Sequence, residues 1–130
     1  RTELEHLATW ADVVERTADA APHGFLIFTH IDVHPLMKLA GHPRRCVEYL
    51  MGNHTIAERM YRHDPAVMLY VPLRVLLYAD DGGRAVFAID QPSAVVASLH
   101  SDAITDVGRE LDAKVLALLE HLHVNTSERQ

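Results

Sequence analysis

The hydrophobic pattern along the chain predicts an alternation of helices and strands. Apolar residues within 3–20 recur at three- and four-residue steps, which predicts an amphipathic helix that Pro22 and Gly24 end. The next stretch, FLIFTHIDV at 25–33, is rich in aromatic and β-branched residues and predicts a strand. A regular apolar stripe over 104–122 predicts a long C-terminal helix.

The centre of the chain predicts the remaining strands. RRCVEYLM, residues 44–51, predicts a second strand, and Asn53 or Thr55 after it can cap a further helix. The β-prone run VMLYVPLRVLLYA, residues 67–79, contains Pro72, which lacks a backbone N–H and therefore requires a bend or an edge position. ADDGG then predicts a tight hairpin turn that leads into another strand, RAVFAID.

These elements together predict an α+β fold. Strands that arrive by hairpins, with helices gathered on one side, are typical of that class. We expect a single domain over residues 1–130, with a polar C-terminal tail from about residue 124. Its centre should be an antiparallel sheet of about four to five strands, with helices packed on one face and a long C-terminal helix.

Composition narrows the possible partners. The chain has 130 residues, 48% of them hydrophobic, and its formal net charge of −6 argues against a nucleic-acid partner. The single cysteine excludes an internal disulfide and suits a reducing compartment, so we expect a cytoplasmic location. No apolar run approaches the roughly 20 residues that a membrane span needs, so no membrane span is expected.

The stretch HIDVH at 30–34 places proton-active side chains at every second position. Because strand residues alternate between two faces, Leu26, Phe28, His30 and Asp32 are predicted to share one face. An apolar floor would then run into a polar end, which is the usual make-up of a small-molecule pocket. We therefore expect these four residues to contribute to a ligand site.

A bend at Pro35 could also bring His34 back towards this site. His30 and His34 are then candidate metal ligands, although on a straight strand they would be roughly 13 Å apart, too far to share one ion. The alternative is structural. Asp32 can cap a short helix that begins near Pro35, and the polar strand end is then simply solvated.

Two residues elsewhere are further candidates. His54 is predicted at a helix N-terminus, where a charged imidazolium is disfavoured, so a neutral ring could ligate a metal or accept a proton. Its alternative role is a tolerated residue in a first helical turn. Arg74 lies between apolar neighbours on a predicted strand and could bind a carboxylate or phosphate. It could equally pair with a dimer partner or extend its head to water.

The chain resembles the domain of unknown function 302 family over roughly residues 20–122. The resemblance is carried by FLIFTHID, by GNHTIAERMYRHDPAVMLYVPLRVLLYADDGG, and by the closing segments IDQPSAVV and ELDAKVLALLEHL. Two departures stand out: Val33 separates Ile-Asp from His34, and His54 stands where the family has the proline of Gly-Asn-Pro. The resemblance implies an antiparallel α+β fold and a homodimer.

Three functions remain open from the sequence. The first is a homodimer that binds a small molecule, with haem as the specific cofactor, held in an apolar slot through His30 or His34. The second is an enzyme in which Asp32 orients one of these histidines as a general base. The third is a structural or protein-interaction module, whose dimer interface would be flat and without a cavity. We place ligand binding first, because no complete catalytic constellation is evident.

Overall fold

The computed structural model describes residues 9–124 and 126 of the chain. Residues 3–8, where the first predicted helix begins, and most of the polar tail lie outside the described residues. In chain order the elements are α2 (Trp10–Ala20), β1 (Leu26–Asp32), α3 (His34–Leu39), β2 (Cys46–Gly52), α4 (His54–Tyr61), the 3-10 helix η1 (Pro65–Leu69), β3 (Leu73–Ala79), β4 (Ala85–Ile89), α5 (Pro92–Val96), the 3-10 helix η2 (Ala97–Leu99) and α6 (Asp102–His121).

The sheet has four strands in the order β1-β2-β3-β4, and every neighbouring pair is antiparallel. The predicted α+β fold with an antiparallel sheet and a long C-terminal helix is therefore confirmed. One prediction is wrong: the first half of the run 67–79 is not a strand. Residues 67–69 belong to η1, residues 70–72 form the connection, and β3 begins at Leu73, directly after Pro72. The Asp64 carboxylate caps η1 by accepting from the Ala66 N–H at 2.9 Å, which favours a helical turn there.

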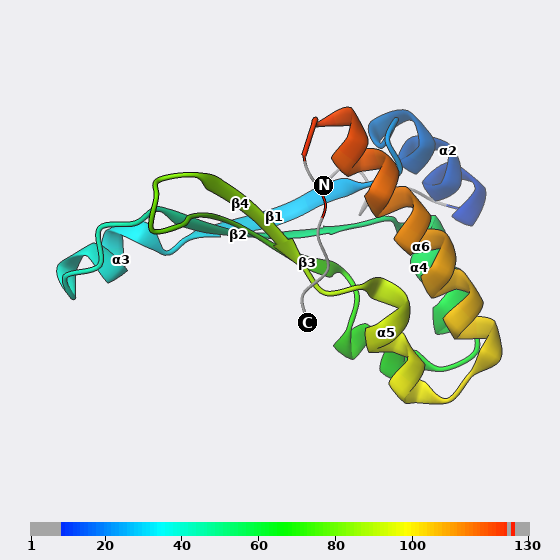
Figure 1. Ribbon diagram of the computed structural model, residues 1–130. Helices are drawn as coiled ribbons and strands as arrows, with labels where there is room; N and C mark the ends of the chain where they lie inside the picture. The colour runs from blue at the N-terminus through cyan, green and yellow to red at the C-terminus, as the bar shows by residue number, and fades with distance from the viewer. Residues whose placement is uncertain (1–8, 125, 127–130) are drawn as a thin grey trace.

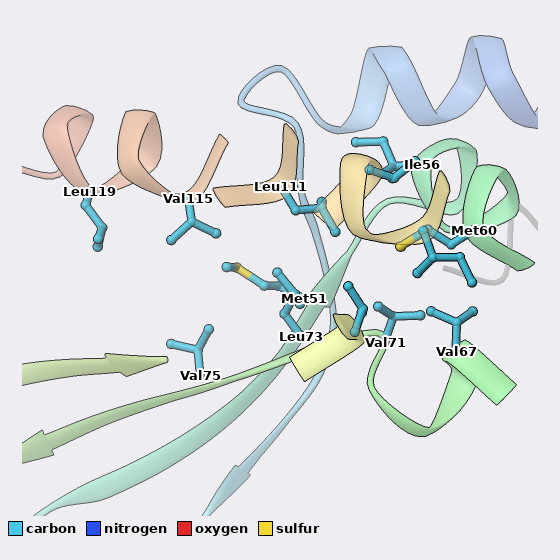
Figure 2. Packing of buried hydrophobic residues seen from close by; sticks show 13 residues of the cluster. Met51, Ile56, Met60, Val67, Val71, Leu73, Val75, Leu111, Val115 and Leu119 are labelled. Atoms are coloured by element: carbon cyan, nitrogen blue, oxygen red, sulfur yellow. The ribbon is translucent and has the colours of Figure 1, made fainter. Parts of the chain in front are cut away.

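The hydrophobic core lies between one end of the sheet and the helices α4 and α6 (Figure 2). The predicted stripe of α6 points into this core, except that Leu119 replaces Leu122, which is 51% exposed. The sheet contributes Met51 from β2 and Val75 from β3. The buried cluster comprises Met51, Ile56, Met60, Val67, Val71, Leu73, Val75, Val96, Ile104, Val107, Leu111, Val115 and Leu119.

Two polar residues of α6 bind the smaller helices. Glu110 receives two hydrogen bonds from the Arg59 guanidinium of α4, at 3.0 and 2.6 Å, and these bonds lower the pKa of Glu110. Asp112 accepts from both the backbone N–H and the hydroxyl of Ser93, at 2.9 and 2.6 Å. Helices α5 and α6 pack closely at Gly108, where a Cβ would lie only 2.8 Å from Val96 Cγ2 of α5. Helix α6 is therefore fixed to α4 and α5 by polar contacts as well as by the core.

The two faces of the sheet differ, and the register defines them. Cross-strand partners share a face, so Met51, Tyr49 and Val47 of β2 lie on the core face. Gly52, Leu50 and Glu48 alternate with them and lie on the outer face. Residues of β1, β3 and β4 are assigned to a face by their partners.

Strand β1 contains an irregularity that reverses its alternation. Ile27 pairs with Met51 and Thr29 with Leu50, so Phe28 is an extra residue without a partner, as in a β-bulge. The prediction that Leu26, Phe28, His30 and Asp32 share a face is therefore wrong. Leu26 pairs with Gly52 on the outer face, whereas His30 and Asp32 pair with Tyr49 and Val47 on the core face.

Half of the sheet extends beyond the helices (Figure 1). We call this half the arm: it is the part of the four strands beyond the Tyr49–Val75 row, together with α3 at its tip. No residue in this part of the strands is buried, and Ile31 and Leu77 are 50% and 38% exposed. The described part of the chain therefore combines a packed helical end with an uncovered apolar sheet.

Candidate functional site

A cavity of about 230 Å³ lies where α4 and η1 meet the covered end of the sheet. Its walls are almost entirely apolar. They include Ile56, Met60, Val71, Leu73 and Leu111, whose side chains Figure 2 shows within the buried cluster. The remaining lining residues are Phe25, Phe28, Gly52, Asn53, His54, Ala57, Met68 and Pro72.

Two residues predicted for a ligand site, Phe28 and His54, meet in this cavity. Their rings are 4.9 Å apart between centroids and inclined by 43°. Glycine at position 52 favours this arrangement, because a Cβ there would lie 3.0 Å from Phe28 Cε2 and 3.3 Å from Pro72 Cβ, and these neighbours would have to move slightly. The bulge in β1 and the missing side chain at Gly52 together let the Phe28 ring lie against the cavity.

Asn53 holds the cavity wall in place. Its side-chain oxygen accepts from the backbone N–H groups of Thr55 and Ile56, at 2.9 and 3.2 Å, so it caps α4 as the sequence predicts. Its amide nitrogen donates to the Gly24 carbonyl at 2.9 Å, on the segment that leads into β1. Since both ends of the Asn53 amide are used, His54 is left as the polar side chain of the cavity that is free to meet a ligand.

His54 has the electrostatics expected of a neutral ligand-binding imidazole. Burial lowers its pKa below the ordinary value, because the charged form loses hydration inside the apolar wall. The sequence predicts a neutral ring for a different reason, the helix N-terminus, and the ring is indeed on the first residue of α4. A neutral imidazole offers one N–H donor and one nitrogen acceptor.

The HIDVH residues lie elsewhere, and their side chains have different partners. The His30 ring packs on Tyr49, with centroids 5.9 Å apart, and is exposed. The Asp32 carboxylate accepts from the His34 backbone N–H at 3.1 Å, at the first residue of α3. The N-cap residue of α3 is Val33, so Asp32 is not the capping residue that the structural alternative predicts. The His34 ring contacts the Arg44 carbonyl through Nδ1 at 3.2 Å. That carbonyl, rather than Asp32, orients the His34 imidazole.

These residues do not converge on a metal ion. Over residues 9–124 no group of three or more His, Cys, Asp or Glu side chains is placed to hold one. Neither His30 nor His34 lines the apolar cavity.

Arg74 and Leu26 also lie outside the cavity. Arg74 is on the outer face and forms an ion pair with Glu48 at 2.5 Å, so its guanidinium already has a carboxylate partner. Leu26 is on the outer face at the start of β1 and is partly buried. Apart from Phe28 and His54, none of the lining residues was predicted as a site residue, and Ile56, Ala57 and Met68 are examples. The sequence shows apolar residues four positions apart along α4, at Ile56 and Met60. It does not show that η1, which carries Met68, lies beside this helix.

Comparisons with known proteins match this fold. The family model described as "Domain of unknown function DUF302" matches residues 1–122. A solved structure, that of an uncharacterized conserved protein DUF302 from Bacillus stearothermophilus, is similar with a TM-score of 0.70 and 16% sequence identity. The similarity covers 87% of this chain and 90% of that one, and at this identity it shows the fold alone. No curated protein matches the chain.

The lowered pKa of His54 predicts a pH-dependent stability. As pH falls below the ordinary histidine value of about 6.5, the unfolded chain takes up protons that the folded state does not. The free energy of unfolding should therefore fall with pH below that value, and level off once pH passes the lowered pKa. We expect His54→Gln to weaken this dependence, measured by urea unfolding at a pH above and a pH below that range.

His42→Gln is the matched control, because His42 is exposed on the α3–β2 connection. It should leave the pH dependence as in the wild type. An unchanged dependence in His54→Gln would contradict the assignment of this effect to the cavity histidine.

Proposed function

The chain belongs to the family described as Domain of unknown function DUF302, and we propose that it binds a small, mostly apolar molecule in the cavity beside His54. The observation that carries this proposal is one imidazole, that of His54, at the wall of an otherwise apolar cavity. Burial there lowers the pKa of His54, which favours the neutral ring. Sites for small molecules combine an apolar lining with a few polar groups that set the orientation of the ligand.

The size of the cavity limits the ligand. Ligand pockets typically enclose about 300–1,000 Å³, so a cavity of about 230 Å³ fits a compound of roughly one ring. Its hydrogen-bonding group would lie at His54, and its apolar part between Phe28 and Met60. Binding is favoured over catalysis because His54 is the single titratable side chain among the described lining residues.

Phenol provides a direct test, since it combines one ring with one hydroxyl. We expect phenol to shift the NMR signals of the Met60 and Met68 methyl groups, which line the cavity, in a saturable way. Ala57→Leu should fill part of the cavity and weaken binding by about tenfold or more, which corresponds to about 1.4 kcal/mol. Titrations followed by methionine-methyl NMR would measure both effects.

Ala113→Leu is the matched control, because Ala113 is an exposed helical alanine on α6 and lies outside the cavity lining. It should bind phenol as the wild type does. His54→Ala should weaken phenol binding more than benzene binding, because benzene has no group for the imidazole. Equal phenol affinity in the wild type and Ala57→Leu would refute the cavity as the binding site.

Haem is the specific cofactor to test, now with His54 as the axial ligand in place of His30 or His34. Among these three histidines, His54 alone lines the apolar cavity, and the thioether of Met68, 52% exposed, lies beside the same space. A porphyrin is larger than the cavity, so binding would require the side next to Met68 to open. Haem titration should then give a Soret band that His54→Ala abolishes and that His30→Ala and His34→Ala retain. A titration without a Soret band would exclude haem as the ligand of this cavity.

We also propose that two copies of the chain associate through the core face of the arm. Val47 and Leu77 lie on this face beyond the Tyr49–Val75 row, where no sheet residue is buried, and Phe87, the partner of Leu77, extends this face to the edge of the core. An apolar sheet that remains this exposed is typical of an interaction surface, and a second copy would cover it symmetrically. The outer face is less suitable, because it carries the Glu48–Arg74 ion pair.

Leu77→Lys should convert this dimer to a monomer, because a charged group would be buried at its centre. Leu69→Lys is the control: Leu69 is 78% exposed on η1, away from the arm. Size-exclusion chromatography with light scattering at micromolar concentration would measure the molar mass. A monomeric wild type, or a dimer in both variants, would contradict the arm as the interface. The single cysteine favours the cytoplasm as the compartment in which this dimer acts.

A further inference from the structure

A second hollow, of about 320 Å³, lies at the tip of the arm and is separate from the apolar cavity. Its floor is the outer face of the sheet, formed by Cys46, Leu76 and Tyr78. Helix α3 contributes Met37 to its side, and the connection between α3 and β2 forms the rest of the wall. The floor and side therefore offer apolar and aromatic surface to a ligand.

The nitrogen-bearing side chains of this hollow are arginines and histidines. Arg44, Arg45, His34 and His42 line it, and among the described residues no aspartate or glutamate does. The whole chain carries a formal charge of −6, so the sign of the charge reverses locally. Such a concentration of guanidinium and imidazole groups beside an apolar floor favours an anion with an organic part.

Part of this basic set has no partner within the protein. Over residues 9–124, neither Arg45 nor His42 forms a side-chain hydrogen bond or an ion pair. Arg44 forms an ion pair with Asp81 at 3.0 Å, but the Asp81 side chain is fully exposed, and such surface pairs are weak. An incoming anion could therefore take the Arg45 guanidinium without breaking a buried contact.

The wall that carries these groups is held by His34. Its Nδ1 lies 3.2 Å from the Arg44 carbonyl, and because a carbonyl can only accept, Nδ1 must carry the hydrogen. This bond ties the Arg44 backbone to α3 next to the floor. On the outer face, Glu48 neighbours Leu76, yet its charge is compensated by Arg74 at 2.5 Å. Glu48 therefore does not oppose an anion strongly, and the exposed Asp81 carboxylate is the acidic group that an anion on Arg44 would displace.

We propose that this hollow binds a small organic anion, with its carboxylate or phosphate on Arg45 and Arg44 and its apolar part on Leu76, Tyr78 and Met37. Guanidinium groups bind both kinds of oxyanion through paired hydrogen bonds. The volume lies within the usual range for ligand pockets, about 300–1,000 Å³. The site is independent of the apolar cavity, and it stays open in the proposed dimer because that interface uses the opposite face.

Phenyl phosphate and inorganic phosphate are the probes for this site. The four methionines of the chain make the experiment specific, because Met37 lines this hollow whereas Met60 and Met68 line the apolar cavity. Phenyl phosphate should shift the Met37 methyl signal in a saturable way and leave the other two unchanged. It should bind more tightly than inorganic phosphate, since only phenyl phosphate can use the Leu76–Tyr78 floor.

Arg45→Gln should weaken phenyl phosphate binding by about tenfold, the effect expected when one charge-assisted hydrogen-bonding group is lost. Arg109→Gln is the matched control, because Arg109 is an exposed arginine on α6 and should leave the affinity unchanged. Binding that is equally weak for both phosphates, equal in Arg45→Gln and the wild type, or unable to shift Met37 would overturn the proposal. Loss of phenol binding in Ala57→Leu with phenyl phosphate binding retained would separate the two sites.

Discussion

The packing of α6 across one end of the sheet is the constraint on which the rest of the structure depends. Leu111 and Val115 bury their side chains against Met51, Leu73 and Val75, and this contact supplies the centre of the core. A helix of 20 residues in this orientation covers only part of the sheet. The covered part holds the apolar cavity at its border with α4, and the uncovered part becomes the arm. The apolar cavity and the exposed arm therefore both result from the position of α6 on the sheet.

The covered and uncovered ends suit different chemistry. At the covered end, removal of water favours neutral groups, and the lowered pKa of His54 reflects this environment. At the tip of the arm, Arg44 and Arg45 are exposed, so their guanidinium groups keep contact with water next to an apolar floor. A neutral compound is therefore suited to one end of the molecule and a charged one to the other.

The sequence predicted the features that depend on local pattern. The apolar stripe of α6 and the Asn53 cap of α4 each depend on residues close together in the sequence, and the structure contains both. The candidate site was predicted only in part, because its assembly is non-local. Phe28 and His54 meet in the cavity, whereas His30 and Asp32 lie outside its lining. The extra position in β1, which puts Leu26 and His30 on opposite faces, is marked by no residue type. The partner of Arg74 likewise depends on the register between β2 and β3, which the pattern of either strand leaves open.

The extra residue in β1 also reverses which face of the sheet the following side chains point to. Upstream of Phe28, β1 is in the phase that presents Leu26 to the outer face; downstream, it is in the opposite phase, which presents His30 and Asp32 to the core face. A deletion of one residue at this point would restore simple alternation. It would exchange the surroundings of every side chain on one side of the deletion, even though each amino acid there stayed the same.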